Sequence, residues 1–210
     1  FILPEDIQAQ VEGILFAWQP GTMGGPAIAN LLMGRRSPSG RLPVTFPRSE
    51  AQIPLYYGAY NTGRPGPISE VFWSHYGDGP NTPQYPFGYG LTYSTVSYSK
   101  TELVTLEDGT LALNATVSNT GKVEVDEVVQ VYMRDHHSAY GVRPLKQLID
   151  FRRIAIKAGE TKSFTFILEM DQLSVTDAQG EKHVEPGIFS FWIAPNSVEG
   201  VPATMDWKIE

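Results

Sequence analysis

The sequence predicts an α+β segment followed by an all-β sandwich domain, with the change close to residue 92. Before that point, apolar residues at helical spacing alternate with turns and long loops that are rich in Gly and Pro. Beyond Tyr93 the apolar pattern falls to a period of two, which is typical of strands with one buried face. We therefore expect two units, residues 1–92 and residues 93–210.

The first predicted helix spans residues 5–18. Pro4 suits the first turn of a helix, and the acidic Glu5 and Asp6 stabilise its positively polarised end. Five apolar residues then recur at offsets of four, seven, eight and eleven, which places them on one helical face that we expect to be buried. They are Ile7, Val11, Ile14, Leu15 and Trp18.

The second predicted helix spans residues 26–33. Pro26 lies near its first position, and Gly34 is placed to cap its C-terminus. The side that we expect to be buried consists of Ile28, Leu31 and Leu32. Three glycines precede this helix, but neither a Gly-Lys-Ser/Thr run nor a G-x-G-x-x-G spacing accompanies them, so a turn is favoured over a phosphate-binding loop. They are Gly21, Gly24 and Gly25.

A short strand and a long loop complete the first unit. Residues 42–47 predict a strand that Pro43 and Pro47 confine to an edge. Residues 52–85 carry few periodic signals, and a loop of this length is either functional or laid across another domain. Its aromatic residues suit stacking on a sugar or anchoring on a neighbouring domain. The stretch Pro86–Tyr93 that follows, rich in Gly and aromatic residues, predicts a structural junction.

The second unit shows strand after strand. Apolar alternation predicts strands around residues 111–118, 129–133, 154–156, 164–168 and 189–193, and residues 201–209 are suited to close the module. About seven strands separated by turns are the pattern of an immunoglobulin-like β-sandwich. Because the Cys…Trp…Cys signature is absent, a fibronectin type III-like variant is the better description.

Composition restricts the possible partners and chemistry. The net charge of −7 argues against nucleic acid and anionic membranes as partners. The absence of Cys excludes disulfides, thiolate catalysis and Cys-based zinc sites. No apolar run approaches the roughly 18 residues of a membrane span, and the start lacks a signal-peptide pattern. Because Phe1-Ile2-Leu3 resembles the end of a buried strand, we expect the chain to begin inside a domain.

Few residues suggest chemistry of their own. Asp135-His136-His137 is the densest group of potential metal ligands, but adjacent histidines on a strand point to opposite sides, so no metal site is expected. Asp78 is the first loop carboxylate to consider, with turn capping as the simpler role. Asn114-Ala115-Thr116 fits a glycosylation sequon within a predicted strand. The residues alone indicate a fold and no reaction.

Several motifs occur in an order that is far more specific than any one of them. They are Ala17–Gly21, Gly24–Ala29, Leu32–Gly34, Pro38–Pro47 and Pro86–Tyr93. This run resembles the C-terminal portion of glycoside hydrolase family 3 enzymes, and Asn61–Pro65 is similar to their periplasmic β-glucosidase branch. Further along, Arg143–Leu148, Phe151 and Ala158–Thr161 resemble the fibronectin type III-like domain that ends those proteins.

The resemblance implies a remnant of an α/β sandwich domain with its crossing loop, joined to the terminal β-sandwich. Family members hydrolyse terminal β-linked glucose or related sugars with retention of configuration, using an Asp nucleophile and a Glu acid/base. Neither motif matches any position here, so we expect no catalytic residue, no metal and no cofactor, and the substrate-binding residues stay unknown. The chain is then structural and inactive alone, and its parent is periplasmic or secreted.

The resemblance also implies partners. The rest of the parent hydrolase, its barrel and α/β sandwich, is expected in cis or as a second chain, and the parent takes a β-glucoside or oligosaccharide substrate. Because two helices would expose apolar stripes, the isolated chain is expected to form homo-oligomers. The alternative is a non-catalytic carbohydrate-binding or interaction module that uses exposed aromatics such as Trp73.

Overall fold

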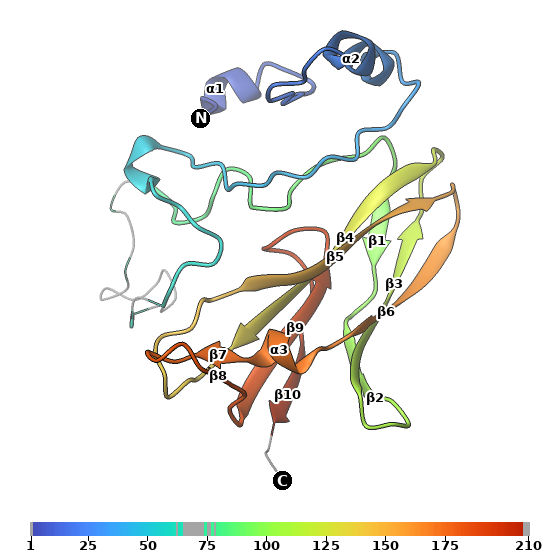
Figure 1. Cartoon of the computed structure of the whole chain (residues 1–210). Coiled ribbons are helices and arrows are strands. Elements are labelled where there is room, and N and C mark those ends of the chain that lie inside the picture. Colours follow the sequence, from blue (N-terminus) through green and yellow to red (C-terminus); the bar gives the residue numbers. More distant parts are fainter. Residues whose placement is uncertain (1, 62, 65–73, 75–76, 78, 208–210) are drawn as a thin grey trace.

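The computed structural model describes residues 2–61, 63–64, 74, 77 and 79–207. The second half of the chain forms a β-sandwich, and the first half lies across it as loops and short helices (Figure 1). The helices α1 and α2 lie at the end of the molecule that is farthest from the C-terminus. Within these described residues, every helix is too short or too polar to cross a membrane.

One sheet of the sandwich is organised around strand β3. It contains β1 (Val96–Tyr98), β2 (Glu102–Thr105), β3 (Leu111–Asn119) and β6 (Thr161–Ile167). Strand β3 pairs antiparallel with each of the other three. Residues 111–118 were predicted as a strand with one buried face, and Leu113, Ala115 and Val117 indeed enter the core. The strands β1 and β2 are three and four residues long, too short for the period-two pattern to predict them.

The opposing sheet runs in the order β10–β9–β4–β5. It contains β4 (Val125–Asp135), β5 (Gln147–Ile156), β9 (Gly187–Ala194) and β10 (Ala203–Trp207). The pairing of β4 with β5 shifts register between Val131 and Tyr132, as at a β-bulge. Two antiparallel four-stranded sheets confirm the predicted fibronectin type III-like sandwich.

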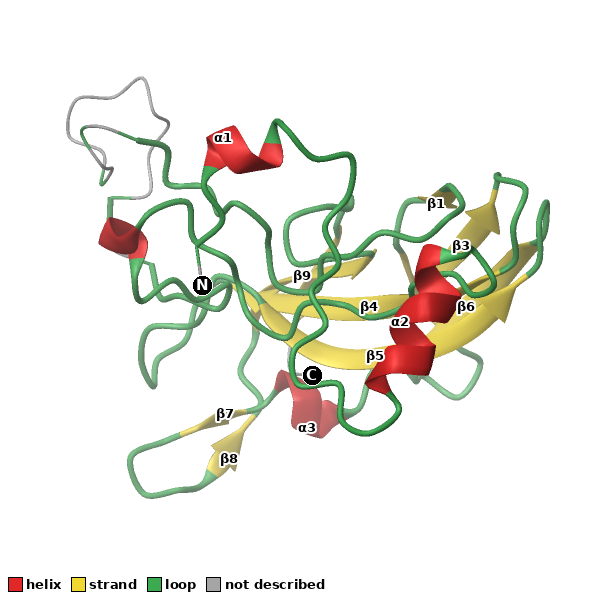
Figure 2. Ribbon diagram, turned by 90° about the horizontal axis from the view of Figure 1, so that it is seen from above, coloured by secondary structure: helices red, strands yellow, loops and turns green. Residues whose placement is uncertain are grey.

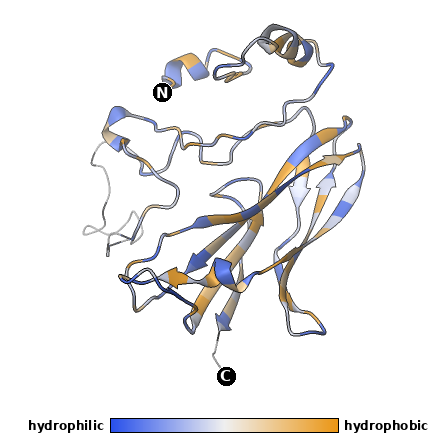
Figure 3. Ribbon diagram, viewed as in Figure 1, coloured by the Kyte–Doolittle hydropathy of each residue, from blue (hydrophilic) through white to orange (hydrophobic). Residues whose placement is uncertain are grey.

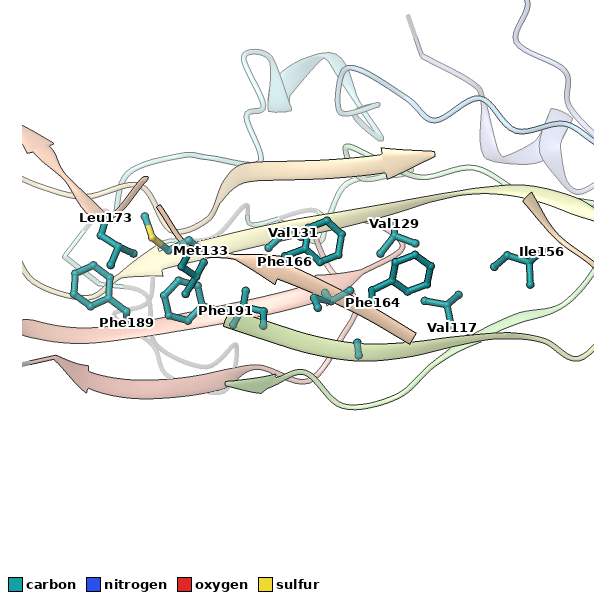
Figure 4. Packing of buried hydrophobic residues seen from close by; sticks show 14 residues of the cluster. Val117, Val129, Val131, Met133, Ile156, Phe164, Phe166, Leu173, Phe189 and Phe191 are labelled. Carbon is teal, nitrogen blue, oxygen red and sulfur yellow. The ribbon is translucent and has the colours of Figure 1, made fainter. Parts of the chain in front are cut away.

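The core lies between the two sheets (Figure 4). Met133, Phe189 and Phe191 gather toward one end, while Val117 and Ile156 lie at the other. The helix α3 (Met170–Leu173) contributes Leu173 to this core, and a capping box holds its start. The hairpin of β7 (Val175–Thr176) and β8 (Lys182–His183) follows α3. Sequence periodicity does not reveal elements this short.

The predicted helix over residues 5–18 is wrong in extent. Helix α1 covers only Glu5–Gln8, and residues 12–17 have no regular secondary structure. Gly13 interrupts the helical pattern, and the apolar run that follows it suits a buried strand as well as a helix. The stripe is also exposed rather than buried: Ile7, Val11, Ile14, Leu15 and Trp18 are each more than two fifths exposed.

The second helix is confirmed, with a start two residues earlier. Helix α2 spans Gly24–Leu32. Gly34 follows its cap with a φ of +67°, and its N–H donates to Leu31 while that of Arg35 donates to Asn30. This is a Schellman motif, so the predicted cap is correct. The predicted burial is wrong, because Leu32 is 72% exposed and Ile28 and Leu31 are only half-buried.

The predicted strand over residues 42–47 does not form as a strand. Instead, residues 40–47 and residues 84–90 run side by side, and we call these two runs the strap. The Leu42 N–H donates to the Tyr89 carbonyl, Gly88 N–H donates to Leu42, and an isolated bridge pairs Phe46 with Tyr85. Because Pro43 and Pro47 lack an N–H, a continuous ladder is not available. Seen from above, this half of the chain is mostly loops (Figure 2).

Candidate functional site

Aromatic rings join the strap to the sandwich. The ring of Phe87 stacks on Tyr57 with centroids 4.2 Å apart, and Tyr57 meets Tyr132 of β4 edge-on at 6.0 Å. The Tyr57 hydroxyl also accepts a hydrogen bond from the Leu148 N–H of β5, at 3.2 Å. The loop next to Tyr57 is pinned in the same way, since Leu145 N–H donates to the Ala59 carbonyl. This part of the long loop is therefore anchored on the neighbouring domain.

A polar cluster lies beneath these rings. The buried amide of Gln130 donates to the carbonyls of Gly88 and Pro195, and its Oε1 accepts from the Tyr132 hydroxyl at 2.6 Å. Gly88 adopts a φ of +80°, and a Cβ there would lie 2.1 Å from Gln130 Oε1. The strap thus approaches the sheet at a point where only glycine fits.

A buried ion pair links Arg41 of the strap to Glu127 of the sandwich. Arg41 Nη2 lies 2.7 Å from Glu127 Oε2, and the two side chains are 8% and 2% exposed. The other carboxylate oxygen accepts from the Tyr98 hydroxyl of β1 at 2.8 Å. Burial, together with the adjacent Glu127 carboxylate, raises the pKa of Tyr98, so its hydroxyl stays a donor. The positive charge of Arg41, which belongs to residues 1–92, is thus neutralised by a carboxylate inside the β-sandwich.

Lys146 is largely buried between two rings of the same sheet. Its Nζ lies 4.9 Å from the Tyr132 centroid and 4.4 Å from the Trp192 centroid. Burial lowers the pKa of Lys146 to about 8. The ammonium forms no ion pair with a carboxylate in the described chain. The electron-rich faces of the two rings stabilise it instead, through cation–π interactions.

A cavity of about 410 Å³ opens at the end of β4. Its lining includes Asn61, Arg134, His136, His137 and the pair Asp135–Arg143. Arg143 Nε lies 3.0 Å from Asp135 Oδ2, and burial raises the pKa of Asp135. Sequence reasoning singled out Asp135 to His137 but missed the two arginines, which lie on either side of them in the chain.

The two histidines, His136 and His137, differ in their surroundings. His136 Nε2 lies 2.9 Å from the Ser190 hydroxyl of β9, and burial lowers the pKa of His136. His137 is exposed. Among the described residues, no group of three or more His, Asp or Glu side chains is arranged to hold a metal ion.

The remaining candidates have separate positions. Asn114 lies in the middle of β3, where its Oδ1 accepts from the Thr165 hydroxyl of β6 at 2.8 Å. Asp78 and Trp73 lie outside the described residues. Gly24 begins α2 close to the ring of Pro20, which agrees with a tight turn there. Neither Asn114 nor Gly24 lines the cavity beside Asp135.

Comparison with known proteins accounts for both halves of the chain. Residues 2–93 match the glycosyl hydrolase family 3 C-terminal domain, and residues 127–197 match the fibronectin type III-like domain. The periplasmic β-glucosidase of Salmonella typhimurium is 41% identical over 93% of this chain. A β-xylosidase of Formosa agariphila is 38% identical over 91% of it.

A solved structure shows the same arrangement. The crystal structure of a β-glucosidase from Listeria innocua matches 96% of this chain with a TM-score of 0.88 and 36% identity, over 28% of its own length. The chain likewise spans only 26% of the Salmonella and Formosa relatives. The two matched domains, in this order and with this fold, show that the chain belongs to glycoside hydrolase family 3, as the C-terminal part of such a protein with its fibronectin type III-like domain.

Proposed function

We propose that this chain is the C-terminal portion of a retaining β-glucosidase, in which it braces the catalytic domains and supplies neither the nucleophile nor the acid/base. The similarity to a periplasmic β-glucosidase along 93% of the chain carries this proposal. The related β-xylosidases leave the preferred sugar open between glucose and its relatives. The parent would act in the periplasm or outside the cell.

We place the domain boundary between residues 92 and 93, directly after the strap. The strap ends at residue 90 and the first strand of the sandwich begins at Val96. The contacts across this boundary are polar as well as aromatic, and they bury Arg41 and Gln130. Two units joined in this way move together, which is what a brace requires.

Bracing would affect rate through geometry. A retaining glycosidase needs its two carboxyl groups about 5 Å apart on opposite sides of the bond to be cleaved. An error of about 1 Å in the placement of such groups costs roughly a hundredfold in rate. A rigid terminal domain that holds the upstream domains in register would then support catalysis without touching the substrate.

A truncation and a chimera test the proposal. We expect the Salmonella relative to lose hydrolysis of an aryl β-glucoside when the part matched by this chain is removed, and to regain it when this chain is fused in its place. The isolated chain should show no turnover above buffer. Turnover by the isolated chain, or full activity of the truncated relative, would contradict the proposal.

The upstream partner can also be tested directly. The chain and the truncated relative, produced as separate polypeptides, should associate and recover part of the activity. A version of the chain with Arg41→Met, in which the strap loses its ion pair with Glu127, should recover less activity than the unchanged chain. If the two polypeptides stay apart in sedimentation, the partner part of the proposal fails.

A further inference from the structure

The cavity at the end of β4 combines an arginine that has no ion pair with a preformed shape. Within the described residues, Arg134 makes no ion pair, whereas Arg143 is paired with Asp135. Two carboxylates, Asp135 and Glu185, lie beside these two guanidinium groups, because Glu185 accepts hydrogen bonds from the lining residues Ser138 and Ala139, so Arg134 is the cation that is left without an ion pair.

The wall of the cavity that follows β4 is fastened to the hairpin region. The Ser138 hydroxyl and the Ala139 N–H both donate to the carboxylate of Glu185, at 2.5 and 3.0 Å. Next to them, the ring of Tyr140 stacks on His183 with centroids 4.6 Å apart. These contacts hold the loop in place without a ligand, so binding would not have to order it first.

We propose that this cavity binds the carboxylate of an acidic sugar, such as a hexuronate, as a non-catalytic site. The planar guanidinium of Arg134 matches a carboxylate with two parallel hydrogen bonds. A single unpaired guanidinium suits a monoanion better than a doubly charged phosphate. The volume of about 410 Å³ lies in the usual range of small-molecule sites and accommodates one or two sugar rings.

An exposed aromatic residue, Tyr60, is the chain neighbour of a residue that lines the cavity. Tyr60 is 63% exposed, and its backbone forms an isolated bridge with Pro144. The chain neighbours of these two residues, Asn61, Arg143 and Leu145, line the cavity. A ring with an apolar face and a polar tip suits a sugar ring better than a small inorganic anion. This site is independent of the glycosidase activity proposed above.

Titration of the 210-residue chain with three ligands tests the site. Binding is followed by chemical shifts in nitrogen–proton correlation spectra with glucuronate, glucose and inorganic phosphate. We expect saturable glucuronate binding, with the largest shifts at the amides of residues 134–143, and binding of glucose and phosphate at least about tenfold weaker. Arg134→Gln should weaken glucuronate binding by roughly tenfold or more, and Arg134→Lys by less.

The control is Lys122→Gln, which removes the same charge at an exposed position outside the cavity. It should leave the affinity for glucuronate within about twofold. The proposal is overturned if glucuronate does not saturate, if glucose binds equally, if phosphate binds more tightly, or if Arg134→Gln and Lys122→Gln behave alike. If Arg134→Gln does not fold, shifts of the wild-type chain that fall outside residues 134–143 overturn it.

Discussion

At the scale of single residues, Gly88 fixes how closely the strap approaches the sandwich. We expect Gly88→Ala to lower the free energy of unfolding by about 2–4 kcal/mol, since it adds backbone strain at positive φ and a clash with Gln130. Gly109→Ala is the matched control, because Gly109 has a φ of +85° and open space around it. Urea unfolding of both variants separates the clash from the strain. Equal losses would show that the close approach does not matter.

Because Lys146 is buried, we expect the free energy of unfolding to depend on pH with a definite sign. Burial lowers the pKa of its amine to about 8, against roughly 10.4 in an unfolded chain. Between these values the unfolded state binds more protons, so the free energy of unfolding rises with pH, by at most about 1.4 kcal/mol per pH unit. Below pH 8 both states are protonated, and the cost of burying the charge is constant.

The measurement compares the wild-type chain with Lys146→Met, which keeps an unbranched apolar side chain between the rings of Tyr132 and Trp192. The free energy of unfolding of the wild type relative to the variant should rise between pH 8 and pH 10. Ionisation of groups far from Lys146 cancels in this difference. A flat or falling difference would show that the amine is not desolvated.

At the scale of elements, the ion pair of Arg41 and Glu127 decides how firmly the strap is attached. We expect Arg41→Met to cost about 3–5 kcal/mol, because it leaves Glu127 buried without a cation. The control is Arg153→Met on β5, which breaks an exposed pair with Asp126 and should cost less than about 1 kcal/mol. Denaturant unfolding compares the two losses. Similar losses would mean that the buried ion pair holds the strap no more firmly than an exposed pair would.

The sandwich was predictable because its strands obey one simple rule. Leu113, Ala115 and Val117 alternate with polar neighbours since one face of β3 meets the core and the other meets solvent. The first unit lacks such a rule. The apolar residues from Ile14 to Trp18 fit a helix stripe and a buried strand equally, and only the neighbouring elements decide between them.

The contacts that attach the strap were beyond sequence reasoning for a different reason. Arg41 and Glu127 are separated by 86 residues, and Gly88 and Gln130 by 42. A local sequence pattern cannot predict which residues will contact each other across such a separation. The aromatic and glycine composition of the stretch Pro86–Tyr93 did predict a packed junction, and the stack of Phe87 on Tyr57 confirms packing there. Its polar half, centred on Gln130, left no signal in the sequence.

At the scale of the whole molecule, the two halves differ in how they treat apolar side chains. The sandwich buries a large apolar cluster between its two sheets, whereas hydrophobic positions on α1 and α2 stay uncovered (Figure 3). Met23, Leu32 and Met33 are each about 70% exposed. A folded protein rarely leaves such a surface to water unless another surface covers it.

This surface predicts that the isolated chain self-associates. We expect its weight-average mass by light scattering to rise with protein concentration, and the replacement of both Leu32 and Met33 by Glu to keep it close to the monomer. The matched control is Val142→Glu, an equally exposed apolar residue on the sandwich loop, which should leave association unchanged. Salt should strengthen association, since burial of apolar area drives it and like charges oppose it. A wild-type chain that stays monomeric at high concentration would show that this surface does not drive association.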